Sequence, residues 1–187
     1  LIHDMANLEY ATSDVHVRAI SKLAQYGLTY DLLLKPLHIR PAIELVRKFS
    51  DQPFVVDHIA KPNIAHKMRS PWQEDIRELA ELDNVFCKLS GMVTEARWGD
   101  WRQVDFHPYL DAVLEAFSPG RLMIGSDWPV CTLSGSYEDV MQIVVEYTNQ
   151  PLLLFHQNSS VTGALKDYDI RHVRVGDFAL YGGDFGP

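Results

Sequence analysis

Asp127 occupies a position in the sequence where a carboxylate could do chemistry. It follows the apolar run 122–124, which has the branched, hydrophobic character of a buried strand. Trp128 and Pro129 come directly after it, and Pro129 cannot continue a strand because it lacks a backbone N–H. A carboxylate and an indole therefore stand together where a buried strand ends, and a carboxylate in such a place can act as a general base toward water.

Three earlier apolar runs also end in ionisable side chains. In chain order they are Asp31 and Lys35, then Asp57, His58 and Lys61, then Lys88 and Glu95. The carboxyl ends of parallel strands meet at one rim, so these side chains would converge there. A single strand-end aspartate is more often a helix cap or a turn former. Four such ends leave two interpretations open, a hydrolytic or metal site and a structural ion-pair network.

The residues between these ends predict alternating strands and helices. Strands are expected at 28–34, 54–59, 85–92 and 122–127, and helices at 16–26, 40–50, 70–84, 105–118 and 136–150. Gly27 is expected to stop the first helix, and Ser70 and Pro71 to be the N-cap and the first residue of the third. Strands that are apolar throughout indicate parallel β/α units covered on both faces, in a doubly wound sheet or a barrel.

Composition narrows the class of protein. The chain has 187 residues, 47% of them hydrophobic, and a formal net charge of −8, which argues against nucleic-acid and anionic-membrane partners. Only two cysteines are present, Cys87 and Cys131, and we expect both to be reduced in a cytoplasmic protein. No apolar run reaches the roughly 18 residues of a membrane span. The first residue is Leu1 rather than Met, so we expect that preceding residues are missing.

Several segments together resemble a known family. "YDLLLKPLH", "VVDHIAKP", "CKLSGMVTEA" and "YLDAVLEAFSPGRLMIGSDWPVC" resemble, in this order, the second half of the amidohydrolase-related (amidohydrolase family 2) metal-dependent hydrolases. The pattern "KLSG-x-VTEA" favours the L-fuconolactonase and sugar-lactonase branch. The family is a TIM-type (β/α)₈ barrel, so the resemblance implies that the four strands are strands 5 to 8 of an incomplete barrel. It implies a partial barrel over 1–150, followed by a divergent tail over 151–187.

The resemblance also implies roles for individual side chains. Asp127 matches the family's eighth-strand aspartate, which accepts a proton from the attacking water, and His58 matches its sixth-strand histidine. Both are expected to be catalytic and to bind a divalent metal, zinc. A lactone carbonyl needs an activated water, a base and positive charge where the oxyanion develops. The residues expected to contact substrate oxygens or the sugar ring are His3, Lys61, Lys88, Glu95 and Trp128. Each lysine could instead be an ion-pair partner at the rim.

The departures from the family leave alternatives open. An amidohydrolase barrel carries an H-x-H pair on its first strand, and this sequence contains no H-x-H. We predict a hydrolase that opens a sugar lactone resembling L-fucono-lactone, with weak zinc binding and little activity in this chain alone. The alternatives are another branch of the same barrel, such as a decarboxylase or another carboxylic-ester hydrolase, and a non-catalytic fragment that acts as an interaction module. Open barrel edges near 28–34 and 122–126 predict oligomerisation.

Overall fold

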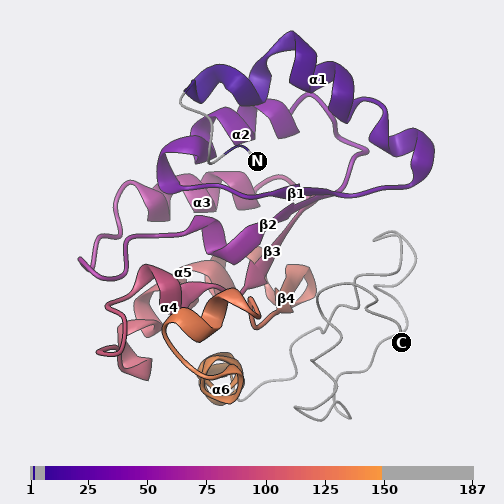
Figure 1. Ribbon diagram of the computed structural model, residues 1–187. Helices are drawn as coiled ribbons and strands as arrows, with labels where there is room; N and C mark the ends of the chain where they lie inside the picture. Colours follow the sequence, from indigo (N-terminus) through magenta and orange to yellow (C-terminus); the bar gives the residue numbers. More distant parts are fainter. Residues whose placement is uncertain (1, 3–6, 149–187) are drawn as a thin grey trace.

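The computed structural model describes residue 2 and residues 7–148 (Figure 1). His3 and the predicted tail over 151–187 lie outside the described residues. The strands are β1 (Tyr30–Leu32), β2 (Phe54–Val56), β3 (Val85–Leu89) and β4 (Leu122–Ile124). The α-helices are α1 (Asp14–Ile20), α2 (Ile39–Val46), α3 (Trp72–Ala80), α4 (Met92–Glu95), α5 (His107–Phe117) and α6 (Tyr137–Thr148).

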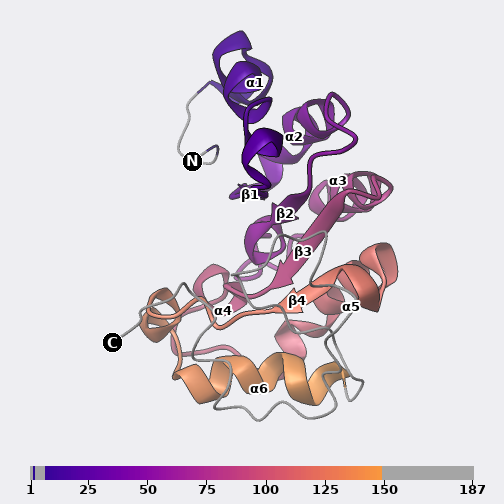
Figure 2. The ribbon, with the colours of Figure 1, turned by 90° about the vertical axis from the view of Figure 1, so that its right-hand side faces the viewer.

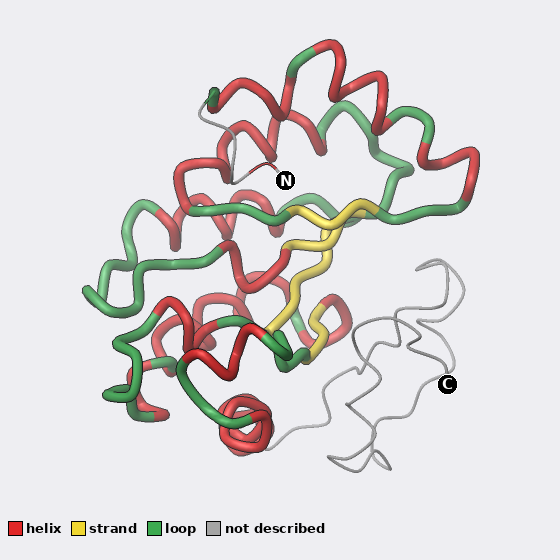
Figure 3. Tube along the Cα trace, in the orientation of Figure 1, coloured by secondary structure: helices red, strands yellow, loops and turns green. Residues whose placement is uncertain are grey.

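The four strands form one parallel sheet in the order β1-β2-β3-β4, so each strand pairs with the next along the chain. Helices α2, α3 and α5 lie on one side of this row of strands, and α3 packs against both α2 and α5 (Figure 2). Figure 3 shows the strands at the centre, with helices and loops around them. The predicted parallel α/β architecture is confirmed, and β1 and β4 are the edges of the sheet.

The two faces of the sheet differ in chemistry because side chains alternate along a strand. Residues that belong to the hydrophobic core shared with the helices are Phe54, Val56, Val85, Cys87, Leu89, Leu122 and Ile124. The alternate positions include Asp31, Val55, Lys88 and Met123, with Asp31 paired to Val55 and Lys88 paired to Met123 in the strand register. The face opposite the helices therefore carries charged groups as well as apolar ones, and it leads to the rim where the strands end.

The first three helices differ from prediction in their boundaries, and α2 ends at Val46 rather than at residue 50. Helix α1 ends at Ile20, and a separate 3₁₀ turn at Leu23–Tyr26 follows it. That turn ends at Gly27 in the left-handed conformation, so Gly27 ends the 3₁₀ turn and not, as predicted, the first helix. Helix α3 begins at Trp72 with Pro71 as its N-cap and no capping side chain, so the predicted roles of Ser70 and Pro71 were wrong. A backbone bond from Gln73 N–H to the Arg69 carbonyl (2.8 Å) serves the first turn instead.

The strands are shorter than predicted: the residues with register partners on a neighbouring strand are 30–32, 54–56, 85–89 and 122–124. Cys87 and Cys131 are both buried with free thiols, as expected. Within the described part of the chain, no helix is long and apolar enough to cross a membrane.

Candidate functional site

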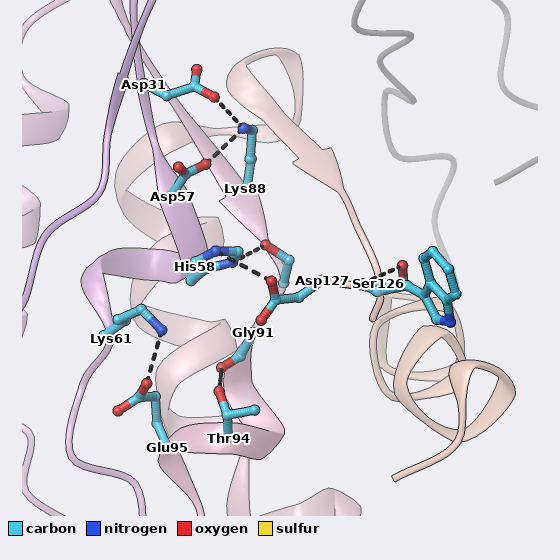
Figure 4. A network of polar contacts seen from close by, with 12 residues as sticks. Asp31, Asp57, His58, Lys61, Lys88, Gly91, Thr94, Glu95, Ser126 and Asp127 are labelled. Carbon is cyan, nitrogen blue, oxygen red and sulfur yellow. Dashed lines mark hydrogen bonds and ion pairs between the residues drawn. The ribbon is translucent and has the colours of Figure 1, made fainter. Parts of the chain in front are cut away.

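Three groups of polar side chains lie at the carboxyl ends of the strands (Figure 4). The first contains Asp31, Asp57 and Lys88, the second contains His58 and Asp127, and the third contains Lys61 and Glu95. They come from four successive strands and the loops that follow them. Apart from Lys35, which is exposed at the start of a 3₁₀ turn, the side chains predicted from the strand ends converge, and they do so as three separate groups.

The central group joins the end of β2 to the end of β4. His58 Nε2 lies 3.5 Å from Asp127 Oδ1, and the two side chains are only 16% and 12% exposed. The other ring nitrogen of His58, Nδ1, lies 2.8 Å from the hydroxyl of Ser90, which follows β3. An imidazole and a carboxylate thus lie beside each other at the rim, and both are largely buried.

The backbone that carries His58 is in an unusual conformation. Four consecutive residues without a glycine, His58 to Lys61, have φ angles of 53°, 47°, 59° and 51°. L-residues visit this left-handed region as single residues, at an energy of about 1 to 2 kcal/mol each. The indole N–H of the buried Trp72 donates to the Ile59 carbonyl at 2.7 Å and helps to hold the segment. Tertiary contacts therefore impose this conformation, as is common at functional sites.

Asp127 shares that backbone strain and is poorly stabilised as an anion. Its φ is 61°, and its Oδ2 is buried without a hydrogen-bond partner among the described residues. The pKa of Asp127 is raised to about 6, chiefly by burial; Lys61 and Lys88 act to lower this pKa, and Asp57 and Glu95 act to raise it. A carboxyl group with this pKa is ionised near neutral pH and still basic enough to take a proton from a water molecule.

Lys88 lies in a different environment, between two carboxylates. Its Nζ is 2.7 Å from Asp31 Oδ2 and 2.6 Å from Asp57 Oδ1, and its side chain is 9% exposed. This is the ion-pair arrangement that the sequence left open as the alternative for a rim lysine. It links β1, β2 and β3 across the face of the sheet opposite the helices.

The third group ties two rim loops together. Lys61 Nζ lies 3.1 Å from Glu95 Oε1, and the Glu95 carbonyl accepts the backbone N–H of Ala65 at 2.9 Å. The loop after β2 and the short helix α4 after β3 are therefore joined by one side-chain and one backbone contact. Lys61 also lies close enough to Asp127 to lower its pKa.

The remaining predicted contacts lie at the margin of the site. Trp128 is 62% exposed, and its backbone N–H donates to the Ser126 hydroxyl at 3.1 Å. Two residues beside His58 were not assigned a role from the sequence, Ser90 and Gly91. Both belong to the segment "KLSG", whose spacing after a buried strand was the available signal.

Sequence comparison now places the chain among known proteins. The family model described as Amidohydrolase (Amidohydro_2) matches residues 1–152. The chain belongs to the amidohydrolase family. An L-fucono-1,5-lactonase of Burkholderia multivorans is 35% identical over 163 residues, covering 81% of this amidohydrolase chain and 54% of that protein. An L-fucono-1,5-lactonase of Burkholderia ambifaria is 36% identical over 140 residues, covering 74% and 48%.

Solved structures give the same family. A crystal structure of an amidohydrolase from Burkholderia multivorans with bound zinc has a TM-score of 0.76 and 34% identity, covering 81% of this amidohydrolase and 56% of that chain. An amidohydrolase 2 from Bifidobacterium longum has a TM-score of 0.61 at 18% identity, which shows a shared fold. The chain thus spans about half the length of the curated relatives it matches.

A zinc ion is bound in that Burkholderia neighbour, and zinc requires particular kinds and numbers of donor atoms. His58 and Asp127 are ligand types that zinc accepts, and the unpartnered Oδ2 of Asp127 is available as a donor. Zinc sites use three or four protein ligands, however. The residues that the structure describes contain no group of three or more His, Cys, Asp or Glu side chains placed to hold a metal. The described residues of this amidohydrolase therefore fit part of a metal site and not a complete one.

Proposed function

We propose that this amidohydrolase chain is the carboxy-terminal half of a sugar-lactone hydrolase whose substrate resembles L-fucono-1,5-lactone. In this proposal β1 to β4 are the fifth to eighth strands of a (β/α)₈ barrel. The observation that carries it is the close approach of His58 and Asp127, 3.5 Å apart at the carboxyl ends of β2 and β4. Active sites of such barrels are built at that end of the strands. The 35% identity to an L-fucono-1,5-lactonase supports the choice of substrate.

Asp127 is the proposed general base of the reaction. A water oxygen attacks the lactone carbonyl carbon while Asp127 takes a proton from that water. The carbon–oxygen bond of the ring then breaks, the departing alkoxide takes the proton that Asp127 had accepted, and an open-chain hydroxy acid is released. The raised pKa of Asp127, about 6, suits a base that works near neutral pH.

His58 is proposed to orient the carbonyl or the water beside Asp127. His58 and Asp127 would also supply two of the ligands of a divalent metal, zinc, with the others coming from the rest of the barrel. Such a metal supplies Lewis-acid polarisation of the carbonyl when bound. The proposed contacts to substrate oxygens are His3, Lys61 and Glu95, and Trp128 would offer a flat apolar wall to the sugar ring. Lys88, which the sequence also offered as a substrate contact, is instead proposed to hold the strands through its two carboxylate partners.

We propose three further properties of the chain: its compartment, its capacity to associate and the nature of its tail. The buried free thiols of Cys87 and Cys131 favour a reducing compartment, the cytoplasm. The edge strands β1 and β4 are places where another chain could add to the sheet. Residues 151–187 are proposed to be a divergent tail that follows the partial barrel.

The proposal is tested by combining this chain with the amino-terminal half of a related lactonase. The 187-residue chain is purified alone and also co-expressed with the amino-terminal half of the Burkholderia multivorans L-fucono-1,5-lactonase. We measure zinc content and hydrolysis of L-fucono-1,5-lactone above the uncatalysed rate. We expect substoichiometric zinc and little turnover from the chain alone, because two ligands make an incomplete site, and turnover from the complemented complex.

Two results would contradict the proposal. Stoichiometric zinc with full turnover from the isolated chain would show that the other half is dispensable. A folded, metal-loaded complex that hydrolyses no lactone would favour a non-catalytic interaction module, or another branch of the family.

A further inference from the structure

The left-handed segment His58 to Lys61 begins a loop that is closed at its base by the first residue of α3. That residue, Trp72, donates its indole N–H to the Ile59 carbonyl at 2.7 Å, across 13 positions of the chain. Ile59 is 0% exposed and Trp72 is 2% exposed. An indole has one donor and no acceptor, so a buried tryptophan needs one acceptor. Here that acceptor belongs to the segment that carries His58.

A second aromatic residue supports the same loop. Tyr109, in α5, packs against Trp72 with 5.4 Å between the ring centroids. Its hydroxyl donates to the carbonyl of Met68, a residue of the loop, at 3.3 Å. Two packed rings from neighbouring helices therefore each bind one backbone carbonyl of the loop, and they do so from outside it.

The Trp72 contact falls on the residue for which this backbone conformation is least favourable. Ile59 has a φ of 47°, and a β-branched residue at positive φ is a genuine outlier. A hydrogen bond inside the segment, from the Lys61 N–H to the His58 carbonyl at 2.8 Å, closes a turn but does not involve Ile59. A strained conformation persists where the surrounding structure over-determines it. Trp72 supplies such a contact at the strained residue itself.

We propose that Trp72 is a positioning residue for the site. By binding the Ile59 carbonyl it keeps Ile59 in the left-handed conformation, and this fixes the direction in which His58, the preceding residue, leaves the backbone. Lys61 is also held by Glu95 at 3.1 Å, so loss of the Trp72 contact should displace His58 more than Lys61. This inference rests on the proposed function only for the use of His58 in turnover, and not for the conformation of the segment.

The test removes a single hydrogen-bond donor with little change in shape. Trp72 is replaced, by nonsense-codon suppression, with benzothienylalanine, in which a sulfur atom stands in place of the indole N–H. The same replacement at Trp101 is the matched control, because the Trp101 indole N–H also donates to a backbone carbonyl at 2.7 Å, that of Ser134. Ser134 belongs neither to the left-handed segment nor to the proposed site. The pair of variants thus separates an effect on the segment from a general loss of stability.

Backbone NMR chemical shifts of residues 58–61 in the 187-residue chain report the conformation of the segment. We expect left-handed shifts in the native chain and in the Trp101 variant, and movement toward extended values at Ile59 in the Trp72 variant. The thermal midpoints of the two variants should fall by similar amounts, because each loses one hydrogen bond of the same length. Left-handed shifts that persist in the Trp72 variant would overturn the inference.

If the Trp72 variant fails to fold, hydrogen exchange in the native chain decides instead. The indole N–H of Trp72 should exchange slowly, like that of Trp101, whereas the N–H of Trp128, which is 62% exposed, should exchange fast. Slow exchange at Trp72 supports the contact with Ile59. A Trp72 N–H that exchanges as fast as that of Trp128 would overturn the inference.

Turnover in the complemented complex separates this inference from the proposed function. We expect the Trp72 variant to lower kcat by about tenfold with KM within about threefold of native, since misplacing a site residue by about 1 Å can cost ~10²-fold. The Trp101 variant should keep the native kcat. A released segment, with no lactone hydrolysis by the native complex, would count against the lactonase proposal and for the role of Trp72. Unchanged kcat in an active complex would count against the role of Trp72.

Discussion

Two groups of charges lie side by side at the same rim and differ in how well they are satisfied. Lys88 is held by two carboxylates at 2.7 and 2.6 Å, so its ammonium has strong partners on both sides. Asp127 has a buried oxygen without a partner among the described residues, a left-handed backbone, and a neighbouring imidazole at 3.5 Å. Lys88, Asp57, His58 and Asp127 are all largely buried, yet the Lys88 group is built of short, complementary contacts and the Asp127 group is not.

The comparison separates a structural use of charge from a chemical one. Short ion pairs that link three strands stabilise the arrangement of the sheet, and removing one partner leaves a buried charge behind. A carboxylate whose pKa is raised by burial is poorly stabilised as an anion. Binding of a proton, a metal or a substrate can stabilise it. Proximity at the rim is therefore not enough to call a residue catalytic, and the partners of each group must be counted.

The largest expected effect is on catalysis, from Asp127→Asn in the complemented complex. Asparagine keeps the size of the side chain and tolerates the left-handed backbone, but it cannot take a proton. We expect turnover to fall at least a hundredfold, since general-base catalysis contributes ~10² to 10⁴-fold. Steady-state hydrolysis of the lactone is the measurement, and turnover within a few-fold of native would reduce Asp127 to a turn residue.

Lys88→Met should affect stability most. It leaves the partly buried Asp57 without its ammonium partner, and breaking such a pair lowers the free energy of unfolding by about 3 kcal/mol. The free energy of unfolding of both chains is measured by urea denaturation. Lys61→Met is the control, because the Lys61–Glu95 pair is more exposed and should contribute about 1 kcal/mol or less. Equal effects of the two changes would show that the Lys88 group is no more structural than the rim pair.

Gly91→Ala tests the packing of His58 against the bare Cα. Gly91 has a φ of 61°, where alanine is disfavoured by about 1 to 2 kcal/mol, and the added Cβ also meets the His58 ring. Gly99→Ala is a matched control, since its φ is 70° and an added Cβ has nothing within 4 Å. We expect Gly91→Ala to unfold at lower urea than Gly99→Ala. Identical midpoints would mean that the ring moves aside freely.

The smallest expected effect is a pH-dependent gain in stability from Asp127→Asn. The pKa of Asp127 is raised from 3.8 to about 6 on folding, so its ionised form destabilises the folded chain above pH 6. This destabilisation fades as the pH falls from 6 to 4, because the folded carboxyl becomes protonated first. Two pKa units correspond to about 3 kcal/mol, and solvent at the rim should reduce the effect to about 1 to 2 kcal/mol.

Thermal unfolding of the native chain and of Asp127→Asn at several pH values checks this sign. The variant should have the higher midpoint at pH 8, and the difference should disappear near pH 4. A difference that is constant with pH would mean that the amide gains stability for a reason other than charge.

The fold could be predicted from the sequence to the extent that hydrophobic pattern controls it. Runs such as 54–56 and 122–124 are apolar in every position, and this is what a sheet covered on both faces requires. The start of α3 could not be predicted, because a backbone carbonyl of Arg69 and not a side chain serves its first turn. The pattern of residue types predicts which residues are buried. It does not predict which backbone groups form hydrogen bonds with one another.

The candidate site could be predicted only in part for a related reason. Strand-end position brings His58 and Asp127 to the same rim, so their approach follows from the parallel topology. The left-handed segment His58 to Lys61 has no sequence signal, since none of its residues is a glycine. Ser90 likewise looks like any serine after a strand until the β2–β3 register places its hydroxyl against the imidazole.

The uninterrupted strand order β1-β2-β3-β4 has a consequence for how the chain assembles as it is made. Tyr30 pairs with Phe54, Phe54 with Val85, and Cys87 with Leu122, so each strand after β1 meets a partner that has already been synthesised. No strand must wait for a distant one, and loop closure between neighbours grows only slowly with the length of the connection. The sheet can therefore grow one β/α unit at a time from its first strand, and the rim acquires His58, then Ser90, then Asp127 in the order in which the ribosome delivers them.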